Sequence, residues 1–427
     1  MKVLVIGGGG REHALVWALK KSPQVTEIVC APGNGGIAAL ARCVDVDGGN
    51  VHALLAVVER ERPALTVIGP ELPLSLGIVD ELQKRGHRVF GPTQDAAKLE
   101  TSKAFAKEFM RLHDIPTAAY SVCTTLDEVR DELRRYSVPV VVKADGLAAG
   151  KGVIICDTHL QAEAAAAQML SGALLGYPVE EIVLEEFLDG EELSFFALCD
   201  GKHAIPIAAA QDHKRIGEGD TGPNTGGMGA YSTDTLLSPA MRDWLTINVA
   251  QKTVDGMRSE DTPFVGILFC GMMMTRRGPM VLEFNTRFGD PETQAILMRL
   301  DTDIVDLFEA AINGTANRLT IKMKPGASVC VIAASEGYPG KYPSGRPITG
   351  LDLAVASEDV FIFHSGTAVR DEVLVTAGGR VLGVTAVSTA GLEDALNKAY
   401  ETIKSINFEG IQFRRDIGWR ALAKEKA

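Results

Sequence analysis

The segment VVKADGLAAGKGV, residues 141–153, decides the fold class of this chain. An apolar run ends at Lys143, a turn with Gly146 follows, and GKG at residues 150–152 precedes a second apolar run. Small residues let backbone N–H groups approach phosphate oxygens, and a lysine at a strand end neutralises their charge. A P-loop requires serine or threonine directly after its GK pair, whereas Gly152 and then Val153 follow Lys151 here. The segment therefore predicts a different phosphate-binding loop between two strands, with a plain β-hairpin as the alternative.

The segment LEEFLDGEE, residues 184–192, follows as an apolar run that enters a turn with paired acids. Backbone groups of such a strand can pair with the edge of an adenine, and Glu191 can accept hydrogen bonds from ribose hydroxyls. An acidic, solvated turn is the alternative.

The segment MVLEFNTRFGDPET, residues 280–293, is predicted to be a strand that carries a metal site. Side chains alternate along a strand, so Leu282 and Phe284 point one way while Glu283 and Asn285 point the other. Carboxylate and amide oxygens suit Mg²⁺, which also keeps waters and substrate phosphates as ligands. Arg287 follows on the same face, and its planar fork suits a phosphoryl group or a carboxylate. The alternative is a polar face exposed to solvent.

Short apolar runs alternate with amphipathic stretches from Lys2 to Gly91. This alternation is typical of βαβ units, in which parallel strands form a sheet with helices on both faces. The ligand site of such a sheet lies at the carboxyl ends of its strands. The first part of the chain is therefore predicted to be a doubly wound, Rossmann-like domain. Its strand runs are followed by GGGGREH at Gly7, APGNGG at Ala31, GPELP at Gly69 and GPT at Gly91.

The first glycine loop occupies the position of a dinucleotide fingerprint, but its spacing does not fit one. A GxGxxG pattern requires glycine where Glu12 stands, and the second strand ends without an acid for a ribose. Backbone N–H groups at a helix start attract anions, so residues 8–10 and Arg11 are expected to bind phosphate. Asn34 and Glu71 on neighbouring loops are then expected to hold sugar hydroxyls. A bare tight turn is the remaining alternative.

Composition excludes several classes of protein. The net charge is −12, with 43 basic and 55 acidic residues, and no basic or aromatic-interleaved patch suggests a nucleic-acid partner. Seven dispersed cysteines without a CxxC pair argue against a disulfide framework. Met1 leads directly into a strand-like run, and no apolar stretch is long enough to span a membrane. We therefore expect a cytoplasmic protein with no membrane partner.

At 427 residues the chain exceeds the size of one hydrophobic core, so several domains are expected. A helix is predicted from about Asp95 to Leu112, and Pro116 starts a new unit. A long polar loop is expected over residues 211–232, followed by a helix around residues 238–257. The predicted domains are an N-terminal substrate domain (1–115), a small mobile α+β lid (116–188), a central domain with the metal site (189–324) and a mixed α/β C-terminal domain (325–427) that is mainly structural.

In this order, the lysine before a glycine-rich loop, the EEFL turn and the EFNTR strand resemble the ATP-grasp superfamily of carboxylate–amine ligases. Within it, the chain resembles the phosphoribosylamine–glycine ligase (glycinamide ribonucleotide synthetase) family, with RFGDPET at Arg287 as a specific motif. Gly8 departs from the asparagine that this family usually has. Other matching motifs are GGREHA at Gly9, APGN at Ala31, GPE at Gly69, FGPT at Phe90, SKAFAK at Ser102, QDHKR at Gln211, DTGPNTGGMGAYS at Asp220 and RRDIGWRA at Arg414.

The resemblance implies ligation of glycine to 5-phosphoribosylamine through a glycyl phosphate in purine biosynthesis, with ATP and Mg²⁺ or Mn²⁺ as cofactors. With the motifs above, it assigns ATP to Lys103, Lys143, Gly146, Gly150, Lys151, Gly152, Glu185, Glu186, Leu188 and Glu191, and the metal to Glu283 and Asn285. It assigns catalysis to Arg287, Lys214 and Asp212. It assigns substrate binding to Gly8, Gly9, Gly10, Arg11, Asn34, Glu71, Gly226, Gly227 and Met228.

Two alternative functions differ in class. One is another ATP-grasp ligase with a different acid or amine, and the substrate loops argue against it. The other is a sensor that binds ATP without consuming it, and the metal-ligand pair together with Arg287 argues against that. No exposed apolar stripe stands out, so a monomer is expected.

Overall fold

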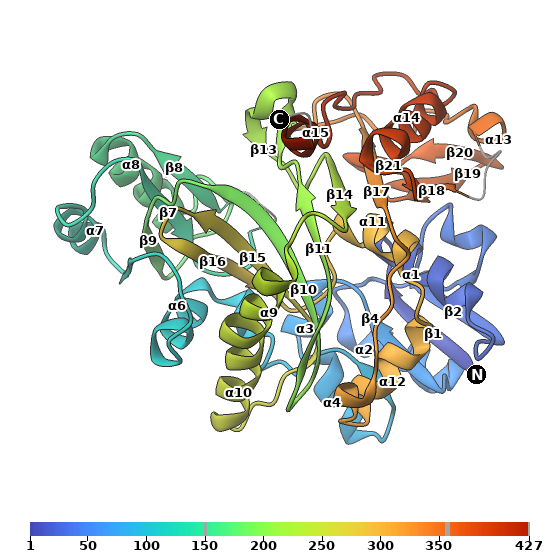
Figure 1. Cartoon of the computed structure of the whole chain (residues 1–427), viewed down its shortest axis with the longest axis horizontal. Coiled ribbons are helices and arrows are strands. Elements are labelled where there is room, and N and C mark those ends of the chain that lie inside the picture. The colour runs from blue at the N-terminus through green and yellow to red at the C-terminus, as the bar shows by residue number, and fades with distance from the viewer. Residues whose placement is uncertain (149–151, 355–358, 426–427) are drawn as a thin grey trace.

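The computed structural model describes residues 1–148, 152–354 and 359–425. Three sheets organise these residues: a five-stranded sheet, a four-stranded sheet and an eight-stranded sheet (Figure 1). All seven cysteines are free, which agrees with the predicted absence of disulfides. Among the helices that the structure describes, none combines the length and the apolar character needed to cross a membrane.

The N-terminal sheet is parallel and carries helices on both faces, as predicted. Val3 and Val5 pack against one set of helices, and Leu4 and Ile6 pack against another. The strand order β3-β2-β1-β4-β5 reverses at β1, so the loops that follow β1 and β4 lie side by side. The elements are β1 (Lys2–Gly7), α1 (Gly10–Lys21), β2 (Glu27–Pro32), η1 (Ile37–Ala39), β3 (Arg42–Cys43), α2 (Val51–Glu61), β4 (Leu65–Ile68), α3 (Glu71–Ser75), α4 (Ile78–Lys84) and β5 (Val89–Phe90).

The single helix expected from about Asp95 to Leu112 is wrong. Two helices form instead, α5 (Lys98–Thr101) and α6 (Lys103–Leu112). Ser102 between them has an extended backbone, and its Oγ accepts the Phe105 N–H at 3.0 Å. This N-cap starts a new helix at Lys103, because a serine side chain satisfies an amide that has no partner within the helix.

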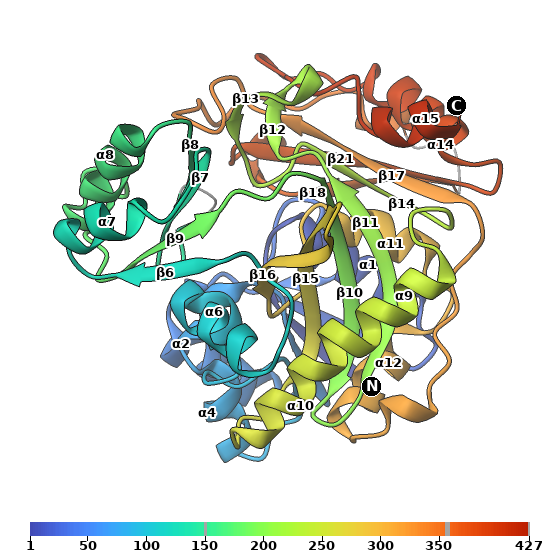
Figure 2. The ribbon, with the colours of Figure 1, turned by 60° about the vertical axis from the view of Figure 1, so that its left-hand side comes forward.

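The lid prediction matches a four-stranded antiparallel sheet with the order β6-β9-β7-β8. Its two helices cover one face and share a separate hydrophobic core with the strands, whereas the other face turns toward the body of the molecule (Figure 2). The lid elements are β6 (Tyr120–Cys123), α7 (Leu126–Leu133), β7 (Val140–Ala144), β8 (Val153–Cys156), α8 (His159–Leu170) and β9 (Ile182–Glu186). Its mobility stays a prediction.

The eight-stranded sheet is antiparallel and runs in the order β16-β15-β10-β11-β14-β17-β21-β18. Strand β14 pairs with β17, so this sheet continues across the domain boundary expected near residue 325. The three predicted boundaries between the four domains therefore remain a proposal. The strands are β10 (Glu191–Asp200), β11 (Ala204–Asp212), β14 (Gly229–Thr233), β15 (Val265–Thr275), β16 (Gly278–Asn285), β17 (Ala327–Ala334), β18 (Val360–His364) and β21 (Arg380–Ser388).

The expectation of a long polar loop over residues 211–232 is wrong. This segment contains the end of β11, a hairpin of β12 (Arg215–Gly217) and β13 (Thr221–Asn224) around η2 (Glu218–Asp220), and the start of β14. The polar residues of this hairpin find partners near the C-terminus. Buried Arg414 pairs with Asp220 at 2.9 Å and donates to the Arg215 carbonyl at 3.1 Å. Periodicity within the loop could not reveal a partner that lies about 200 residues away.

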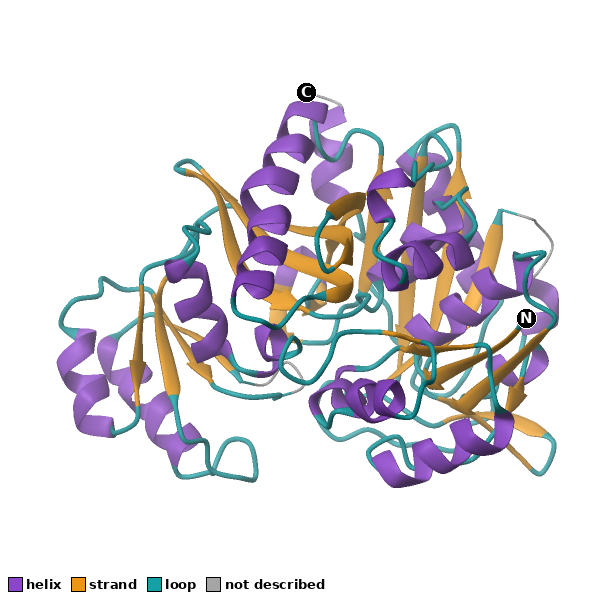
Figure 3. Cartoon of the chain, turned by 90° about the horizontal axis from the view of Figure 1, so that it is seen from below, coloured by secondary structure: helices purple, strands orange, loops and turns teal. Residues whose placement is uncertain are grey.

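Helices cover both faces of the eight-stranded sheet (Figure 3). Phe195 faces α9 and α10 in one core, whereas Phe196 faces α12 in another. The helix expected around residues 238–257 is confirmed, with a π-helical turn, η3, in its middle. The remaining elements are α9 (Pro239–Leu245), η3 (Thr246–Gln251), α10 (Lys252–Ser259), α11 (Glu292–Arg299), α12 (Ile304–Ile312), η4 (Ala316–Arg318), α13 (Leu351–Ala354), β19 (Thr367–Arg370), β20 (Val373–Thr376), α14 (Leu392–Ile403) and α15 (Trp419–Glu425).

Two histidines meet where helix α1 contacts β18. The rings of His13 and His364 are 5.5 Å apart, and His13 Nδ1 accepts the His364 N–H at 2.8 Å. Burial lowers the pKa of His13 from 6.5 to about 3 and the pKa of His364 from 6.5 to about 4. Both imidazoles are therefore neutral at neutral pH.

We expect the free energy of unfolding to fall as the pH drops from 7 to 5. Unfolded histidines take up protons near pH 6.5, whereas the folded ones do so only near pH 4 and 3. Each histidine then costs roughly 2 kcal/mol at pH 5. In urea unfolding, His364→Asn should lose about 2 kcal/mol less over this range than the unmodified chain. The exposed control His52→Asn should match the unmodified chain, and an equal loss in His364→Asn would contradict the expectation.

Candidate active site

Four cations surround the carboxylate of Glu283 on β16. Lys103 starts α6, Lys143 lies on β7 of the lid, Lys214 follows β11, and Arg287 follows β16. Burial by itself would raise the pKa of Glu283, but Lys214, Lys143, Lys103 and Arg287 outweigh it and lower that pKa. The structure thus brings together residues predicted for ATP, metal and catalysis. Such a concentration of positive charge around one acid suits a polyphosphate with a metal ion.

Lys103 also contacts the glycine-rich loop of the lid. Its Nζ donates to the Gly146 carbonyl at 2.8 Å, and Gly146 has a φ of +95°, a conformation that favours glycine. Burial lowers the pKa of Lys103. The predicted phosphate ligands Gly150 and Lys151 lie outside the described residues. Gly152 is described, and a Cβ there would lie 2.6 Å from the Ala148 Cβ, so only glycine fits.

The side chains of the turn between the lid and the central sheet are occupied by other contacts. The Glu185 side chain is buried against lysines and is not open to a ribose or an adenine. Glu186 pairs with Arg277 at 2.6 Å, and Leu188 is buried. The side chains of Glu185, Glu186 and Leu188 are therefore engaged or buried. Their backbone groups are left to pair with the edge of an adenine, which is the contact predicted from the sequence.

The prediction chose Glu191 for the ribose, but the structure turns Glu192 toward the cations. Glu192 pairs with Lys214 at 2.7 Å. Glu191 points to the other face of β10, where it pairs with Lys424 of α15 at 2.6 Å and lines a cavity with Leu193. Neighbouring residues of a strand face opposite sides, so the two acids serve different faces of β10, and the assignment of Glu191 to the ribose stays a prediction. We propose Glu192 as the alternative.

Strand β16 carries the predicted metal ligands, although its alternation is interrupted. The pairing register shifts opposite Gly271 and Met272, so Val281 and Phe284 are the buried residues. The expectation that Leu282 shares the face of Phe284 is therefore wrong, because a bulge changes the period of two. Glu283 keeps its predicted place among the cations.

Arg287 joins β16 to the N-terminal part of the chain. Its guanidinium lies 3.1 Å from Glu71, 2.7 Å from Glu100 and 3.1 Å from the Asn285 Oδ1. Burial would raise the pKa of Glu71, but Arg287 and Arg11 lower it to about 2. Glu71 was predicted to hold sugar hydroxyls, and here it serves as an ionised partner for Arg287.

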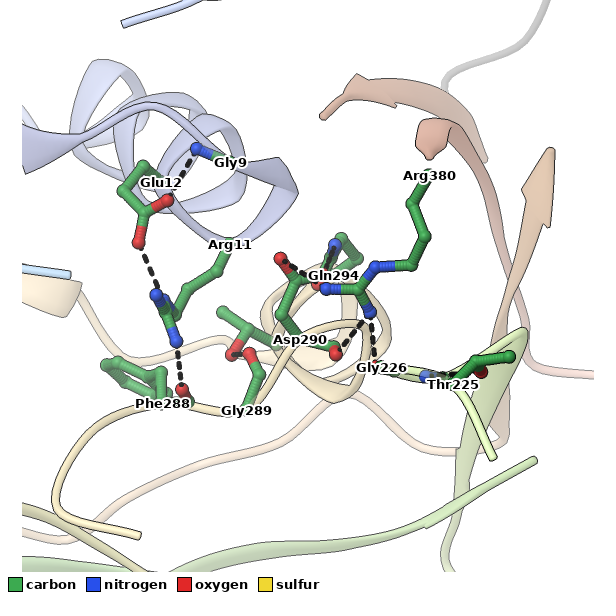
Figure 4. A network of polar contacts seen from close by, with 12 residues as sticks. Gly9, Arg11, Glu12, Thr225, Gly226, Phe288, Gly289, Asp290, Gln294 and Arg380 are labelled. Atoms are coloured by element: carbon green, nitrogen blue, oxygen red, sulfur yellow. Dashed lines mark hydrogen bonds and ion pairs between the residues drawn. The ribbon is translucent and has the colours of Figure 1, made fainter. Parts of the chain in front are cut away.

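The first glycine loop already holds an anion, which the sequence-based prediction did not foresee. The Gly9 N–H donates to Glu12 Oε2 at 2.6 Å, and Arg11 pairs with Glu12 Oε1 at 2.6 Å (Figure 4). Arg11 also donates to the Phe288 carbonyl at 3.0 Å and is 6% exposed. The helix start that was expected to bind a phosphate through residues 8–10 is thus capped by a carboxylate of the chain itself.

The side chain of Asn34 holds loops together. Its Nδ2 donates to the Gly8 carbonyl at 2.9 Å and to the His364 carbonyl at 2.7 Å. Its Oδ1 accepts the N–H groups of Gly36 and Ile37, each at 2.9 Å. Both donors and the acceptor are engaged, so the predicted contact of Asn34 with a sugar would require these bonds to break.

The amides of residues 226–228 also have partners within the chain. They donate to the Tyr338 hydroxyl, the Thr225 Oγ1 and the His213 carbonyl at 3.0, 3.0 and 2.9 Å. The expectation that these amides bind a γ-phosphate or acyl phosphate therefore lacks free donors in this structure. Their role here is to shape the loop beside Asp212.

Arg380 of β21 ties this loop to the one that follows β16. It donates to the carbonyls of Gly226 and Asp290 and lies 3.3 Å from the Asp290 carboxylate (Figure 4). The C-terminal part was expected to be mainly structural, and Arg380 shows that it also holds two loops beside the site in place. Arg380 could not be found from the sequence, because it stands alone among apolar strand residues.

Asp212 at the end of β11 is a half-buried acid with a buried, unused oxygen. Its Oδ1 has no hydrogen-bond partner among the residues that the structure describes. Burial and the nearby Glu292 raise the pKa of Asp212 well above its ordinary value, although Lys214 and Arg380 oppose this shift. A raised pKa near a cationic centre is suited to proton transfer at neutral pH.

Sequence reasoning missed several charged residues that line the centre. Their signals were weak: three belong to the SKAFAK and RFGDPET motifs, and one neighbours a predicted ligand. The missed residues are Glu100, Lys107, Glu192, Asp290, Glu292 and Arg380.

An antiparallel lid and a larger antiparallel sheet face each other across a cluster of lysines, beside a parallel sheet, and this fold defines an ATP-grasp ligase. Models of the three phosphoribosylglycinamide synthetase domains match most of the chain: the N domain over residues 1–100, the ATP-grasp (A) domain over 101–293 and the C domain over 328–420. The chain belongs to the phosphoribosylamine–glycine ligase family, which is also called phosphoribosylglycinamide synthetase.

Individual relatives agree with this family. The chain is 50% identical over 430 residues to the phosphoribosylamine–glycine ligase of Xanthomonas campestris, with 100% of this chain and 99% of that protein covered. The crystal structure of the Thermotoga maritima ligase is 35% identical, with a TM-score of 0.84 over 98% of this chain and 100% of that one. An MgADP-bound biotin carboxylase domain from Hydrogenobacter thermophilus, 16% identical with a TM-score of 0.74 over 96% of this chain and 91% of that one, shares the fold.

Proposed function

We propose that the chain catalyses ATP + glycine + 5-phospho-β-D-ribosylamine → ADP + phosphate + N1-(5-phospho-β-D-ribosyl)glycinamide. The cationic cluster around Glu283 is the observation that carries this proposal within the family. A carboxylate is a poor acyl donor, so it needs activation by a phosphoryl group, and this step requires a site for the phosphates of ATP. No covalent enzyme intermediate is needed, which agrees with the lack of an evident nucleophilic residue in the motifs.

In the first step the glycine carboxylate attacks the γ-phosphoryl group, ADP leaves and glycyl phosphate forms. Phosphoryl transfer depends mostly on positioning and charge neutralisation. Lys103 and Lys143 hold the α- and β-phosphates, and Arg287 and Lys214, which also act on Glu283, meet the transferring group. Closure of the lid would keep water away from the acyl phosphate.

A divalent metal fits the donor atoms of β16. The carboxylate of Glu283 and the amide oxygen of Asn285 are oxygen ligands, which Mg²⁺ and Mn²⁺ accept. Among the described residues, no three or more His, Cys, Asp or Glu side chains are grouped closely enough to hold a metal ion by themselves. Phosphate oxygens and waters would therefore complete the coordination. When bound, the metal neutralises phosphate charge.

In the second step the amine of phosphoribosylamine attacks the acyl carbon, and phosphate leaves. We assign the amine proton to Asp212, because its carboxylate has an unused buried oxygen and a raised pKa. Glu292, whose pKa is also raised by burial, lies near Asp212 and could share this proton.

Phosphate release tests the proposed function. The assay contains ATP, Mg²⁺, glycine and freshly generated phosphoribosylamine, and omits each in turn. Release that requires both substrates, with an equal amount of glycinamide ribonucleotide, supports the proposal. Release with a different acid or amine supports another ATP-grasp ligase, and binding of ATP without consumption supports a sensor. A monomer in the cytoplasm remains our expectation, to be checked by light scattering and cell fractionation.

Lys143→Ala should weaken ATP binding roughly 10- to 100-fold, because a hydrogen bond to a charged group contributes about 1.5–3 kcal/mol. Calorimetric titration with ATP measures the change, and circular dichroism checks the fold. The exposed lysine of α5 provides a matched control, Lys98→Ala, which should bind ATP like the unmodified chain. Unchanged affinity in Lys143→Ala would remove this residue from the site.

A further inference from the structure

Lys143 belongs to a buried charge triad, which also contains Glu185 and Lys107. Glu185 of β9 pairs through Oε1 with Lys143 at 2.7 Å and through Oε2 with Lys107 at 2.9 Å. Glu185 and Lys107 are each 2% exposed, and Lys143 is 6% exposed. Lys107 is one helical turn after Lys103 on α6, but it points away from solvent. A buried charge persists only when it is paired, so one carboxylate serves two ammonium groups here.

This charge triad joins the lid to β16, the strand that carries the predicted metal ligands. Lys107 Nζ donates to Thr117 Oγ1 at 2.7 Å, and the Thr117 hydroxyl donates to the Val281 carbonyl at 2.7 Å. Lys143 Nζ donates to the Leu282 carbonyl at 3.1 Å. Lys143 directly, and Lys107 through Thr117, therefore link Glu185 to adjacent carbonyls of β16. The lid base, α6 and β16 meet at this point.

We propose that Lys107 is a positioning residue that keeps the ammonium of Lys143 available for the phosphates of ATP. With Lys107 present, the three groups carry a net charge of +1, and Glu185 is only partly committed to Lys143. Without Lys107, the Glu185 carboxylate would have Lys143 as its only partner. The two charges would then cancel, and the ammonium of Lys143 would be held by Glu185 instead of binding phosphate. The proposal rests on the proposed role of Lys143 in binding ATP.

The pKa of Lys107 agrees with this arrangement. Burial lowers the pKa to about 8, and Glu185 opposes that shift. Lys107 therefore stays mostly charged at neutral pH.

Lys107→Met removes the charge and keeps the length of the side chain. We expect its Kd for ATP to rise about tenfold, while its Kd for adenosine changes less than twofold, because only ATP carries the phosphates that Lys143 attracts. Equilibrium titration with each ligand measures both constants. Arg111→Met is the matched control, since this exposed cation lies on the same helix, and it should leave both constants unchanged.

The double variant Lys107→Met/Glu185→Gln separates positioning from simple structural support. It replaces the buried pair by neutral groups of similar size and frees Lys143 from the carboxylate. We expect its Kd for ATP to recover to within about threefold of the unmodified chain. A purely structural role predicts the reverse, namely a larger defect in the double variant. If Lys107→Met does not fold, the double variant and Lys107→Arg, which keeps the charge, carry the same comparison.

Different outcomes separate this proposal from the proposed function. Equal weakening of ATP and adenosine in Lys107→Met, or no change in either, overturns the positioning role. Lack of recovery in a folded double variant also overturns it. Failure of the unmodified chain to bind ATP would instead overturn the proposed function.

Discussion

Asp212→Asn is expected to lower kcat for glycinamide ribonucleotide formation by about 10²- to 10⁴-fold, the range that loss of a general base typically produces. The amide cannot take the amine proton, but it keeps the shape of the half-buried acid beside Gly227 and Glu292. Steady-state assays with saturating ATP, glycine and phosphoribosylamine measure the effect. Asp243→Asn, at an exposed acid of α9, is the control and should keep full activity.

Hydroxylamine distinguishes a role of Asp212 in the second step from general damage. It reacts readily with acyl phosphates without enzymatic base catalysis, so glycine hydroxamate reports the first step alone. We expect hydroxamate formation in Asp212→Asn to fall far less than ribonucleotide formation. An equal loss of both reactions would contradict the assignment of the amine proton to Asp212.

Arg287→Lys is expected to lower kcat by on the order of 10²-fold or more, as removal of one preorganised transition-state contact does. The guanidinium fork spans Glu71, Glu100 and Asn285, and a single ammonium cannot hold all three positions. Turnover at saturating substrates measures the loss, and circular dichroism verifies the fold.

The control for this prediction is Arg276→Lys. Arg276 is exposed in the turn between β15 and β16, so the same chemical change there should leave turnover intact. Turnover like that of the unmodified chain in Arg287→Lys would remove Arg287 from the transition state. Loss of ATP affinity without loss of turnover would assign it to nucleotide binding.

The direction of side chains on β10 shows where sequence reasoning reaches its limit. The segment LEEFLDGEE identified the right turn, but Glu191 and Glu192 are adjacent acids, and composition does not distinguish them. The choice depends on the register of β10 against β11 and β15, which places Glu192 beside Lys214 and Glu191 beside Lys424. Register is set by pairing between distant segments.

The glycine-rich loops show that sequence alone does not tell whether backbone amides are free to bind a ligand. Glycine-rich sequence at a helix start correctly indicates exposed N–H groups and room for an anion. It does not reveal whether a carboxylate of the chain already occupies that place, as Glu12 does at Gly9. The amides of residues 226–228 are occupied in the same way: they donate to the neighbouring Thr225 side chain, to the His213 carbonyl and to the Tyr338 hydroxyl.

The sequence by itself determined the parallel N-terminal sheet, the lid with Lys143 and the strand with Glu283, because periodicity and short motifs are local properties. Only the tertiary structure decided that Lys107 and Lys143 share Glu185, that Arg287 pairs with Glu71, and that Arg380 reaches Asp290. Each of these contacts joins segments that are far apart in the chain. Buried charges need partners, and which partner each one meets depends on how the sheets pack.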